Sequence, residues 1–221
     1  MRKVVLVVHV SMDGVIQSPG APEEDPSEGF ELGGWIFPFS DEKSGQFYQN
    51  AMGKKYEILM GRRTYEMLAA TWPFEEGELA DQLNAATKHV VAGAGAKLSW
   101  TNSKRLGGDA TEAVADLKKS RGPALVVIGS GQLVKSLLAA ELIDQITALT
   151  YPIVLGSGKR LFEEGAPPSA WKLAKSAHSP KGVVANTFVR DGKVKTGTFV
   201  KKPSTEELAR RKRLAAESPR R

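Results

Sequence analysis

The chain has 221 residues, 41% of them hydrophobic and 25% charged, which is ordinary for a globular protein able to bury a large core. It contains no cysteine, which excludes disulfides, thiolate metal ligands and a cysteine nucleophile, and with three scattered histidines we expect no metal site. No apolar run approaches the roughly 18 residues of a membrane span. The N-terminal apolar run is interrupted by His9 and Asp13, which does not fit a signal peptide, so we expect a cytoplasmic protein.

The net charge of +6 is concentrated near the C-terminus. Residues 201–221 hold eight basic and three acidic side chains, whereas the body before them holds 23 basic and 22 acidic ones. A nearly neutral body offers no electrostatic footprint for nucleic acid, which we therefore do not expect as a partner. We expect residues 201–221 to form a basic, mobile tail, with a short helix capped by Ser204 as the alternative. A role of Arg210–Arg213 as a tether to a polyanion stays open.

The first half of the chain alternates between strand and helix patterns. A β-branched run at 3–10 predicts a strand buried on both faces. Residues 17–40, rich in glycine, proline and acids, predict a long loop, and long loops in compact domains are usually functional. The elements expected next are a helix at 42–55, a strand at 56–60, a helix at about 62–70 and a short strand at 88–92.

The second half begins with the same alternation and then changes character. A helix at 111–121, a buried strand at 124–128, a helix after Gly131 and a long strand at 145–155 are expected in that order. Two further strands, 183–189 and 193–200, are predicted to form a hairpin through Asp191-Gly192, because Asp-Gly is a strong hairpin signal. We therefore expect one α/β domain over residues 1–200, with a mixed, mostly parallel central sheet, flanking helices and a C-terminal antiparallel hairpin.

Two junctions share the order buried strand, glycine, helix: Leu59–Arg62 and Val127–Gly131. If both strands are parallel in one sheet, both helix N-termini lie at the same carboxyl edge. Free backbone N–H groups there, beside glycines that allow close approach, form an anion site, and two such sites suit a ligand with two phosphates. Arg62 and Arg63 are candidates for the extra 2′-phosphate of NADP. The alternative is a solvated helix start at which Thr64 satisfies a backbone group.

Two better-known phosphate motifs do not fit. The stretch Gly129–Val134 lacks the third glycine of the Rossmann fingerprint, and no acid follows about 20 residues later. The stretch Gly156–Lys159 has Ile153 where a Walker loop needs glycine and Arg160 where it needs serine or threonine, so it predicts a turn.

Five motifs occur in an order that carries a family resemblance: Ser11–Val15, Gly33–Trp35, Met60–Tyr65, Gly129–Gly131 and Pro152–Phe162. Together they resemble the dihydrofolate reductase-like family that includes the reductase domain of the bifunctional riboflavin biosynthesis protein. The likeness covers residues 1 to about 200 and leaves the basic tail outside. It implies the three-layer fold of that family, NADPH as the cofactor and a homodimer.

The resemblance also implies roles for individual positions. The phosphates of NADPH would meet Gly61, Arg62, Arg63 and Thr64 at the first junction, and Gly129, Ser130, Gly131, Gln132 and Leu133 at the second. Asp13 and Gly14 match the loop that covers the nicotinamide. Trp35 and Phe37, with the helix near Asp41, would line the substrate side.

The chain departs from the family pattern in three places. Ala92-Gly93 stands where many relatives hold the adenosine phosphate with a serine. The acid that protonates folate has no unambiguous counterpart; Asp41 is nearest by position, and a helix cap is its alternative role. The sequence holds no His/Cys zinc cluster of the kind that the deaminase half of the riboflavin protein needs, so we expect no deaminase activity.

The resulting hypothesis is an NADPH-dependent reductase. A hydride would pass to a C=N or C=O group of a small heterocyclic substrate, pterin-like or pyrimidine-like, and Asp41 or a water held by Asp13 would supply the proton. The alternative is a nucleotide-binding sensor or scaffold without turnover, because fold does not dictate function.

Overall fold

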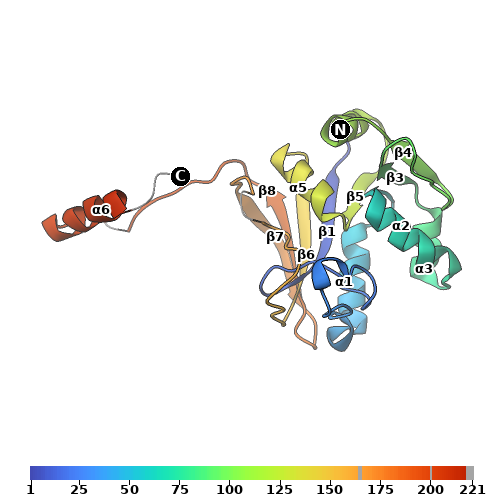
Figure 1. Cartoon of the computed structure of the whole chain (residues 1–221), viewed down its shortest axis with the longest axis horizontal. Coiled ribbons are helices and arrows are strands. Elements are labelled where there is room, and N and C mark those ends of the chain that lie inside the picture. The colour runs from blue at the N-terminus through green and yellow to red at the C-terminus, as the bar shows by residue number, and fades with distance from the viewer. Residues whose placement is uncertain (164–165, 200, 218–221) are drawn as a thin grey trace.

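The computed structural model describes residues 1–163, 166–199 and 201–217. Its centre is an eight-stranded sheet in the order β4-β3-β2-β5-β1-β6-β8-β7 (Figure 1). Neighbouring strands from β4 to β6 are parallel to one another. The strand β8 is antiparallel to both of its neighbours, β6 and β7. The strands are β1 Val4–Ser11, β2 Tyr56–Gly61, β3 Lys88–Val91, β4 Ser103–Leu106, β5 Ala124–Ile128, β6 Gln145–Tyr151, β7 Trp171–His178 and β8 Val184–Arg190. The predicted mixed, mostly parallel sheet is confirmed.

Helices cover both faces of this sheet. They are α1 Glu42–Met52, α2 Arg62–Thr71, α3 Glu78–Ala85, α4 Ala110–Lys119 and α5 Gly131–Ala139, with α6 Thr205–Glu217 in the tail and short 3-10 turns η1 Ser27–Gly29, η2 Phe37–Phe39 and η3 Trp72–Phe74. Alternate residues of β1 enter two separate cores. Val5 and Val7 pack in the core that holds Tyr65 of α2, whereas Leu6 packs in the one that holds Leu137 of α5. The strand buried on both faces that the run at 3–10 predicted is confirmed, and the fold is the three-layer one that the family resemblance implied.

The C-terminal hairpin exists, but the predicted position was wrong. The partner of β8 is β7, which precedes it, and the described residues after Arg190 form no strand. The turn lies at Ser179–Gly182, where Gly182 has φ +85° and donates its N–H to the Ser179 carbonyl at 3.0 Å. Asp191-Gly192 instead lengthens the ladder, because its backbone exchanges hydrogen bonds with Ala170. The element β7 is an exposed edge strand without the alternation that marks a strand in sequence.

The basic tail contains a helix that stands apart from the sheet (Figure 1). The Ser204 hydroxyl accepts the N–H of Glu207 at 3.2 Å, so the alternative of a helix capped by Ser204 is confirmed. None of the described residues of α6 is buried. The mobility of the tail stays a prediction. Over the described residues, every helix is too short or too polar to cross a membrane.

The unequal lengths of the central strands shape one edge of the sheet. Val7 of β1 pairs with Ile128, the last residue of β5, but β1 continues alongside β6 until Ser11 pairs with Tyr151. Residues 8–11 of β1 therefore extend beyond the end of β5. The chain that leaves β5 at Gly129 turns away beside them, which opens space at the carboxyl edge.

Candidate active site

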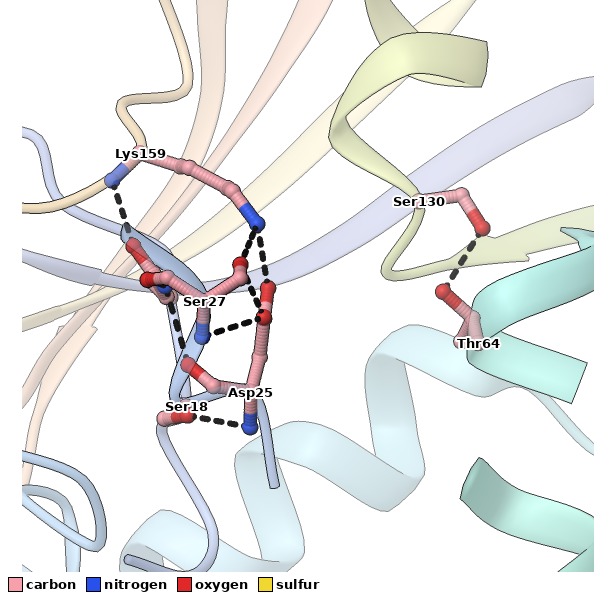
Figure 2. A network of polar contacts seen from close by, with 7 residues as sticks. Ser18, Asp25, Ser27, Thr64, Ser130 and Lys159 are labelled. Carbon is pink, nitrogen blue, oxygen red and sulfur yellow. Dashed lines mark hydrogen bonds and ion pairs between the residues drawn. The ribbon is translucent and has the colours of Figure 1, made fainter. Parts of the chain in front are cut away.

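The two glycine junctions lie side by side at this edge. Leu59 of β2 pairs with Val127 of β5 in parallel register. Gly61 and Gly129 each come two residues after this pair, so the two junctions start at the same level of the sheet. Ser130 joins the junctions: its Oγ accepts the Gly61 N–H at 2.7 Å and donates to Thr64 Oγ1 at 2.8 Å (Figure 2). The topology thus brings the starts of α2 and α5 together.

Both helix starts leave backbone donors available. The caps of α1 and α4 are Asp41 and Asp109, whose carboxylates accept first-turn N–H groups. In contrast, Gly61 caps α2 and Ser130 caps α5 without a side-chain hydrogen bond within the described chain, and neither first turn contains an acid. Unsatisfied N–H groups at the positive end of a helix dipole attract anions.

The turn between β5 and α5 depends on an unusual backbone. Gly129 has φ +59°, and a Cβ there would come within 3.0 Å of the Thr64 methyl carbon. Ser130 also adopts a left-handed conformation, with φ 65°, which is uncommon for a residue with a side chain. At Gly131, in contrast, an added Cβ would meet only Ile16, at 3.8 Å. The space in front of α5 is therefore open enough for a ligand to approach its first turn.

The two arginines flank this region. Arg62 Nη1 donates to both oxygens of Glu66, at 2.8 and 2.9 Å, with both side chains half exposed. Arg63 is exposed. Arg62 also borders a second, shallow hollow with Gly93 and Lys97, beyond the end of β3. Arg62 and Lys97 thus both border the hollow that Gly93 lines.

One cleft of about 1730 Å³ runs from the junctions along the sheet edge to α1 and the long loop. The predicted site residues in its lining are Asp41, Gly61, Arg62, Arg63, Thr64, Gly129, Ser130, Gly131, Gln132 and Leu133. The predicted residues outside the lining are Asp13, Gly14, Trp35 and Phe37. The predicted cofactor residues other than Gly14 therefore lie on one surface, together with Asp41, whereas the predicted substrate residues Trp35 and Phe37 do not line it.

The four residues outside the lining have other surroundings. The Asp13 carboxylate accepts hydrogen bonds from Ser11 Oγ at 2.7 Å and from the backbone N–H groups of Leu155 and Gly156, and these hold the pKa of Asp13 well below its usual range. Gly14, in the same turn, has φ +88°. Asp13 thus fastens the loop after β1 to the 155–160 turn.

The two aromatic residues differ from one another. Trp35 is buried and donates its indole N–H to the Gln17 carbonyl at 2.8 Å. Its ring packs edge-on against Tyr151, with the ring centroids 5.4 Å apart. Phe37 is 80% exposed. Trp35 therefore supports a cleft residue from behind, and Phe37 faces solvent.

Asp41 has the alternative role that its position suggested. Its carboxylate accepts the Ser44 N–H at 2.7 Å in a capping box and the Lys181 N–H at 3.1 Å. The Ser44 hydrogen bond is the largest of the effects that lower the pKa of Asp41. A carboxylate stabilised in this way holds no proton to donate near neutral pH.

Sequence reasoning missed the polar aromatic cluster of the cleft, which consists of His9, Tyr48 and Tyr151. His9 stacks on Tyr48 with ring centroids 5.1 Å apart and planes 13° from parallel. His9 Nδ1 and the Tyr151 hydroxyl share a hydrogen bond of 2.9 Å. The available signal was a histidine inside a valine-rich strand that is otherwise buried.

The long loop is anchored at the mouth of the cleft. Lys159 Nζ donates to Asp25 Oδ2 and Ser27 Oγ, both at 2.6 Å (Figure 2). Gln17 Oε1 accepts the Lys159 backbone N–H at 3.0 Å. Burial alone would raise the pKa of Asp25, but Lys159 and Ser27 lower it overall. In the same loop, burial raises the pKa of Glu24. The Gly156–Lys159 turn thus fixes this loop.

Comparisons with known proteins agree with this geometry. Residues 2–185 match the model of the RibD C-terminal domain. The uncharacterized protein YwjB of Bacillus subtilis (strain 168) is 28% identical over 169 residues, which is 74% of this chain and 84% of that protein.

Solved structures share the fold at low sequence identity. A putative riboflavin biosynthesis protein from Shewanella sp. PV-4 matches with a TM-score of 0.61 and 19% identity, over 86% of this chain and 99% of that one. A pyrimidine reductase-like protein from Corynebacterium diphtheriae matches with 0.58 and 11%, over 86% and 92%. Dihydrofolate reductase from Enterococcus faecalis, complexed with NADP(H) and RAB-propyl, matches with a TM-score of 0.55 and 16% identity, over 86% of this chain and 96% of that one. The chain therefore belongs to the RibD C-terminal domain family of reductases, which has the dihydrofolate reductase-like fold.

Proposed function

We propose that the protein is an NADPH-dependent reductase that transfers a hydride to a C=N or C=O group of a small heterocyclic substrate, pterin-like or pyrimidine-like. One observation carries this proposal: two uncapped helix starts, joined through Ser130, lie on the same cleft as a cluster of planar polar rings. A dinucleotide needs anion-binding groups for its phosphates and a flat, partly apolar space for its reacting ring.

The residues present fit NADPH. First-turn N–H groups of α5, from Gly131 to Leu133, and of α2, from Arg62 to Thr64, would hold the diphosphate. The guanidinium groups of Arg62 and Arg63 would favour the 2′-phosphate over a free hydroxyl, because a guanidinium pairs with phosphate through two parallel hydrogen bonds. When bound, the reduced nicotinamide supplies the hydride.

One observation favours the alternative of a sensor or scaffold without turnover. Asp41, the acid that the family resemblance suggested, is committed to capping α1 and has a lowered pKa. A reductase of this type also needs a proton for the reduced product. The two functions therefore differ in whether the cleft holds another proton donor.

Cofactor titration tests the proposal. We expect NADPH to bind more tightly than NADH when cofactor fluorescence is followed, and failure of both to bind would overturn the proposal. NADPH oxidation is then measured with pterins, pyrimidinone ribityl compounds and simple carbonyls. Binding of NADPH without oxidation across this panel would support the sensor instead.

We further propose that the chain is a cytoplasmic homodimer. Seven of the eight residues of β7 are exposed, and an edge strand with unpaired backbone groups can pair with another chain. Sedimentation of the full chain at several concentrations tests this, and a monomer throughout would contradict it.

A further inference from the structure

The histidine of the cleft occupies a central place between the two ends of the site. β1 lies between β5 and β6, and His9 pairs with Leu149, two residues beyond the position where β5 ends. Like Val5 and Val7, His9 is an odd-numbered residue of β1 and faces α1. The imidazole therefore stands between the glycine junctions that would hold the cofactor and the rings of Tyr48 and Tyr151.

The His9 imidazole has contacts on its face and at Nδ1, whereas Nε2 has no partner among the described residues. Tyr48 stacks on its face, and the Tyr151 hydroxyl binds Nδ1. Tyr151 is itself packed by Trp35 and Phe39. Nε2 forms no hydrogen bond with the described residues and is not one of their buried unpaired polar atoms. Because His9 lines the cleft, Nε2 is the imidazole atom that a ligand there can reach.

Both partners of the hydrogen bond are neutral near pH 7. Burial lowers the pKa of His9 to about 4, and it raises the pKa of Tyr151 to about 12. The other ionisable groups that act here are Tyr48 of α1, which is also a phenol with a raised pKa, and the carboxylates of Asp41 and Glu24, which act on the tyrosines. A neutral imidazole carries one proton, and the hydrogen bond on the other nitrogen determines which nitrogen holds it.

The surroundings favour the proton on Nε2. If Nδ1 donated to Tyr151, the phenol proton would have no acceptor among the described residues, and an unpaired donor in such a pocket is costly. If Tyr151 donates to Nδ1, both of these polar atoms are paired. The imidazole then presents Nε2–H to the cleft as a hydrogen-bond donor.

We propose that His9 donates the proton of the reductase reaction through Nε2, with Tyr151 as the residue that positions it and refills Nδ1. This inference rests on the proposed reductase function. It answers the observation that favours the sensor, because it supplies the donor that Asp41 cannot be. A neutral imidazole that polarises a carbonyl is an established catalytic device in unrelated enzymes.

In the proposed step, hydride transfer to the acceptor carbon is accompanied by proton transfer from His9. The acceptor carbon gains a hydride whose two electrons come from the reduced cofactor, and the π pair of the C=X bond, where X is oxygen or nitrogen, moves to X. An X–H bond forms as the Nε2–H bond breaks, while the Tyr151 proton moves to Nδ1. Nε2 then takes a proton from water as Nδ1 returns its proton to the Tyr151 phenolate, which restores the starting tautomer and leaves hydroxide in the solvent. The transfer is downhill for an alkoxide, because an alkoxide is about as basic as hydroxide and is therefore more basic than the Tyr151 phenolate to which the charge moves.

The first test needs no turnover. Proton–nitrogen NMR of the imidazoles in the full chain should show His9 as the Nε2–H tautomer and neutral down to about pH 5, a unit above its pKa of about 4. The variant H9N assigns the signal, and Y151F should shift His9 toward a mixture of tautomers. A Nδ1–H tautomer in the unaltered protein, or a half-charged His9 near its ordinary pKa of about 6.5, would overturn the proposal.

The second test uses NADPH and the best acceptor of the panel. H9N keeps a polar partner for Tyr151 but removes Nε2, so kcat should fall about 100-fold or more, as expected for loss of a general acid, with NADPH affinity unchanged. The matched control is H178Q, a histidine that is exposed on β7, and it should retain full activity. Unchanged kcat in H9N would refute the inference while leaving the reductase intact. If NADPH fails to bind, the reductase function fails and the NMR result still decides the tautomer.

Discussion

Arg62 forms an ion pair with Glu66, and a phosphate group could replace Glu66 as its partner. Both side chains are half exposed, and exposed pairs of this kind contribute little to stability. We expect Arg62→Ala to weaken NADPH binding about 10-fold to 100-fold, because a charge-assisted hydrogen bond contributes about 1.5–3 kcal/mol. NADH lacks the 2′-phosphate, so its affinity should not change. Fluorescence titrations with both cofactors measure the difference.

Two neighbouring substitutions are controls for that measurement. Glu66→Gln frees Arg62 without removing it, so NADPH affinity should stay the same or rise. Arg63→Ala removes an exposed guanidinium one residue further on and should cause a smaller loss. Equal losses of NADPH and NADH affinity in Arg62→Ala would mean that Arg62 does not contact the 2′-phosphate.

Lys88 makes stability depend on pH in the alkaline range. Its side chain is fully buried, with Nζ over the Trp100 ring and bonded to the Asn84 and Thr101 carbonyls, and burial lowers its pKa from 10.5 to about 8. Between these pH values the unfolded chain binds more protons than the folded one, so the stability should rise with pH.

The Lys88 prediction is tested against a variant that cannot titrate at this position. Relative to Lys88→Met, the unaltered protein should gain up to about 3 kcal/mol in free energy of unfolding between pH 8 and pH 10.5, from 1.36 kcal/mol for each pKa unit. Urea unfolding at several pH values measures this. A difference between the two proteins that is constant with pH would show that the pKa of Lys88 is not lowered.

Site residues that belong to one short sequence motif could be predicted, whereas site residues that only the packing of distant elements brings together could not. The Gly61 and Gly129 junctions each lie within one strand-to-helix connection, so glycine and buried-strand patterns revealed them. His9, Tyr48 and Tyr151 come from three elements far apart in the chain, and their contact depends on the register of β1 with β6. No local pattern encodes that register.

At the scale of elements, Arg2 joins the strands β1, β2 and β5. Its guanidinium donates to Glu57 on β2 at 2.6 Å and to the Pro123 carbonyl, just before β5, at 2.7 Å. Glu57 also accepts a 2.6 Å hydrogen bond from His89 on β3. Removing one partner of a buried pair leaves the other charge uncompensated.

Arg2→Met should therefore destabilise the sheet. We expect a loss of about 2–3 kcal/mol in the free energy of unfolding, toward the low end for buried pairs because the Glu57 side chain is 23% exposed. The double variant Arg2→Met, Glu57→Gln removes the uncompensated charge and should recover part of that loss. Urea unfolding measures both, and no recovery in the double variant would contradict the electrostatic explanation.

The two strands that sequence reasoning missed share a physical cause. β4 and β7 are edge strands at opposite ends of the sheet, and an edge strand exposed to water carries little of the apolar pattern that reveals a buried strand. Asp191-Gly192 has a strong local turn signal, yet the turn forms at Ser179–Gly182 because β7 precedes β8. Strands buried on both faces, such as β1 and β5, were predicted to within a residue or two.

At the scale of the whole molecule, the body and the tail are two electrostatic units. The sheet and α1–α5 hold the cleft, whereas α6 buries none of its described residues. The helix α6 lies apart from the sheet (Figure 1). The tail residues 201–221 contribute eight of the 31 basic side chains but only three of the 25 acidic ones. Cofactor binding and attraction to a polyanion should therefore be separable.

Deleting residues 201–221 tests this separation. We expect NADPH affinity and the free energy of unfolding to stay unchanged, and affinity for heparin, a simple polyanion, to fall and to lose its steep dependence on salt. A variant in which the four basic residues at 210–213 become glutamine keeps the length of the tail and should show most of the same loss. Heparin binding that survives the deletion would locate the polyanion site on the nearly neutral body. Arg62 and Arg63 in the cleft and Lys97 in the adjoining hollow would then be the cations to substitute. Competition between heparin and NADPH distinguishes these cases, because a tail site leaves the cleft free and a cleft site does not.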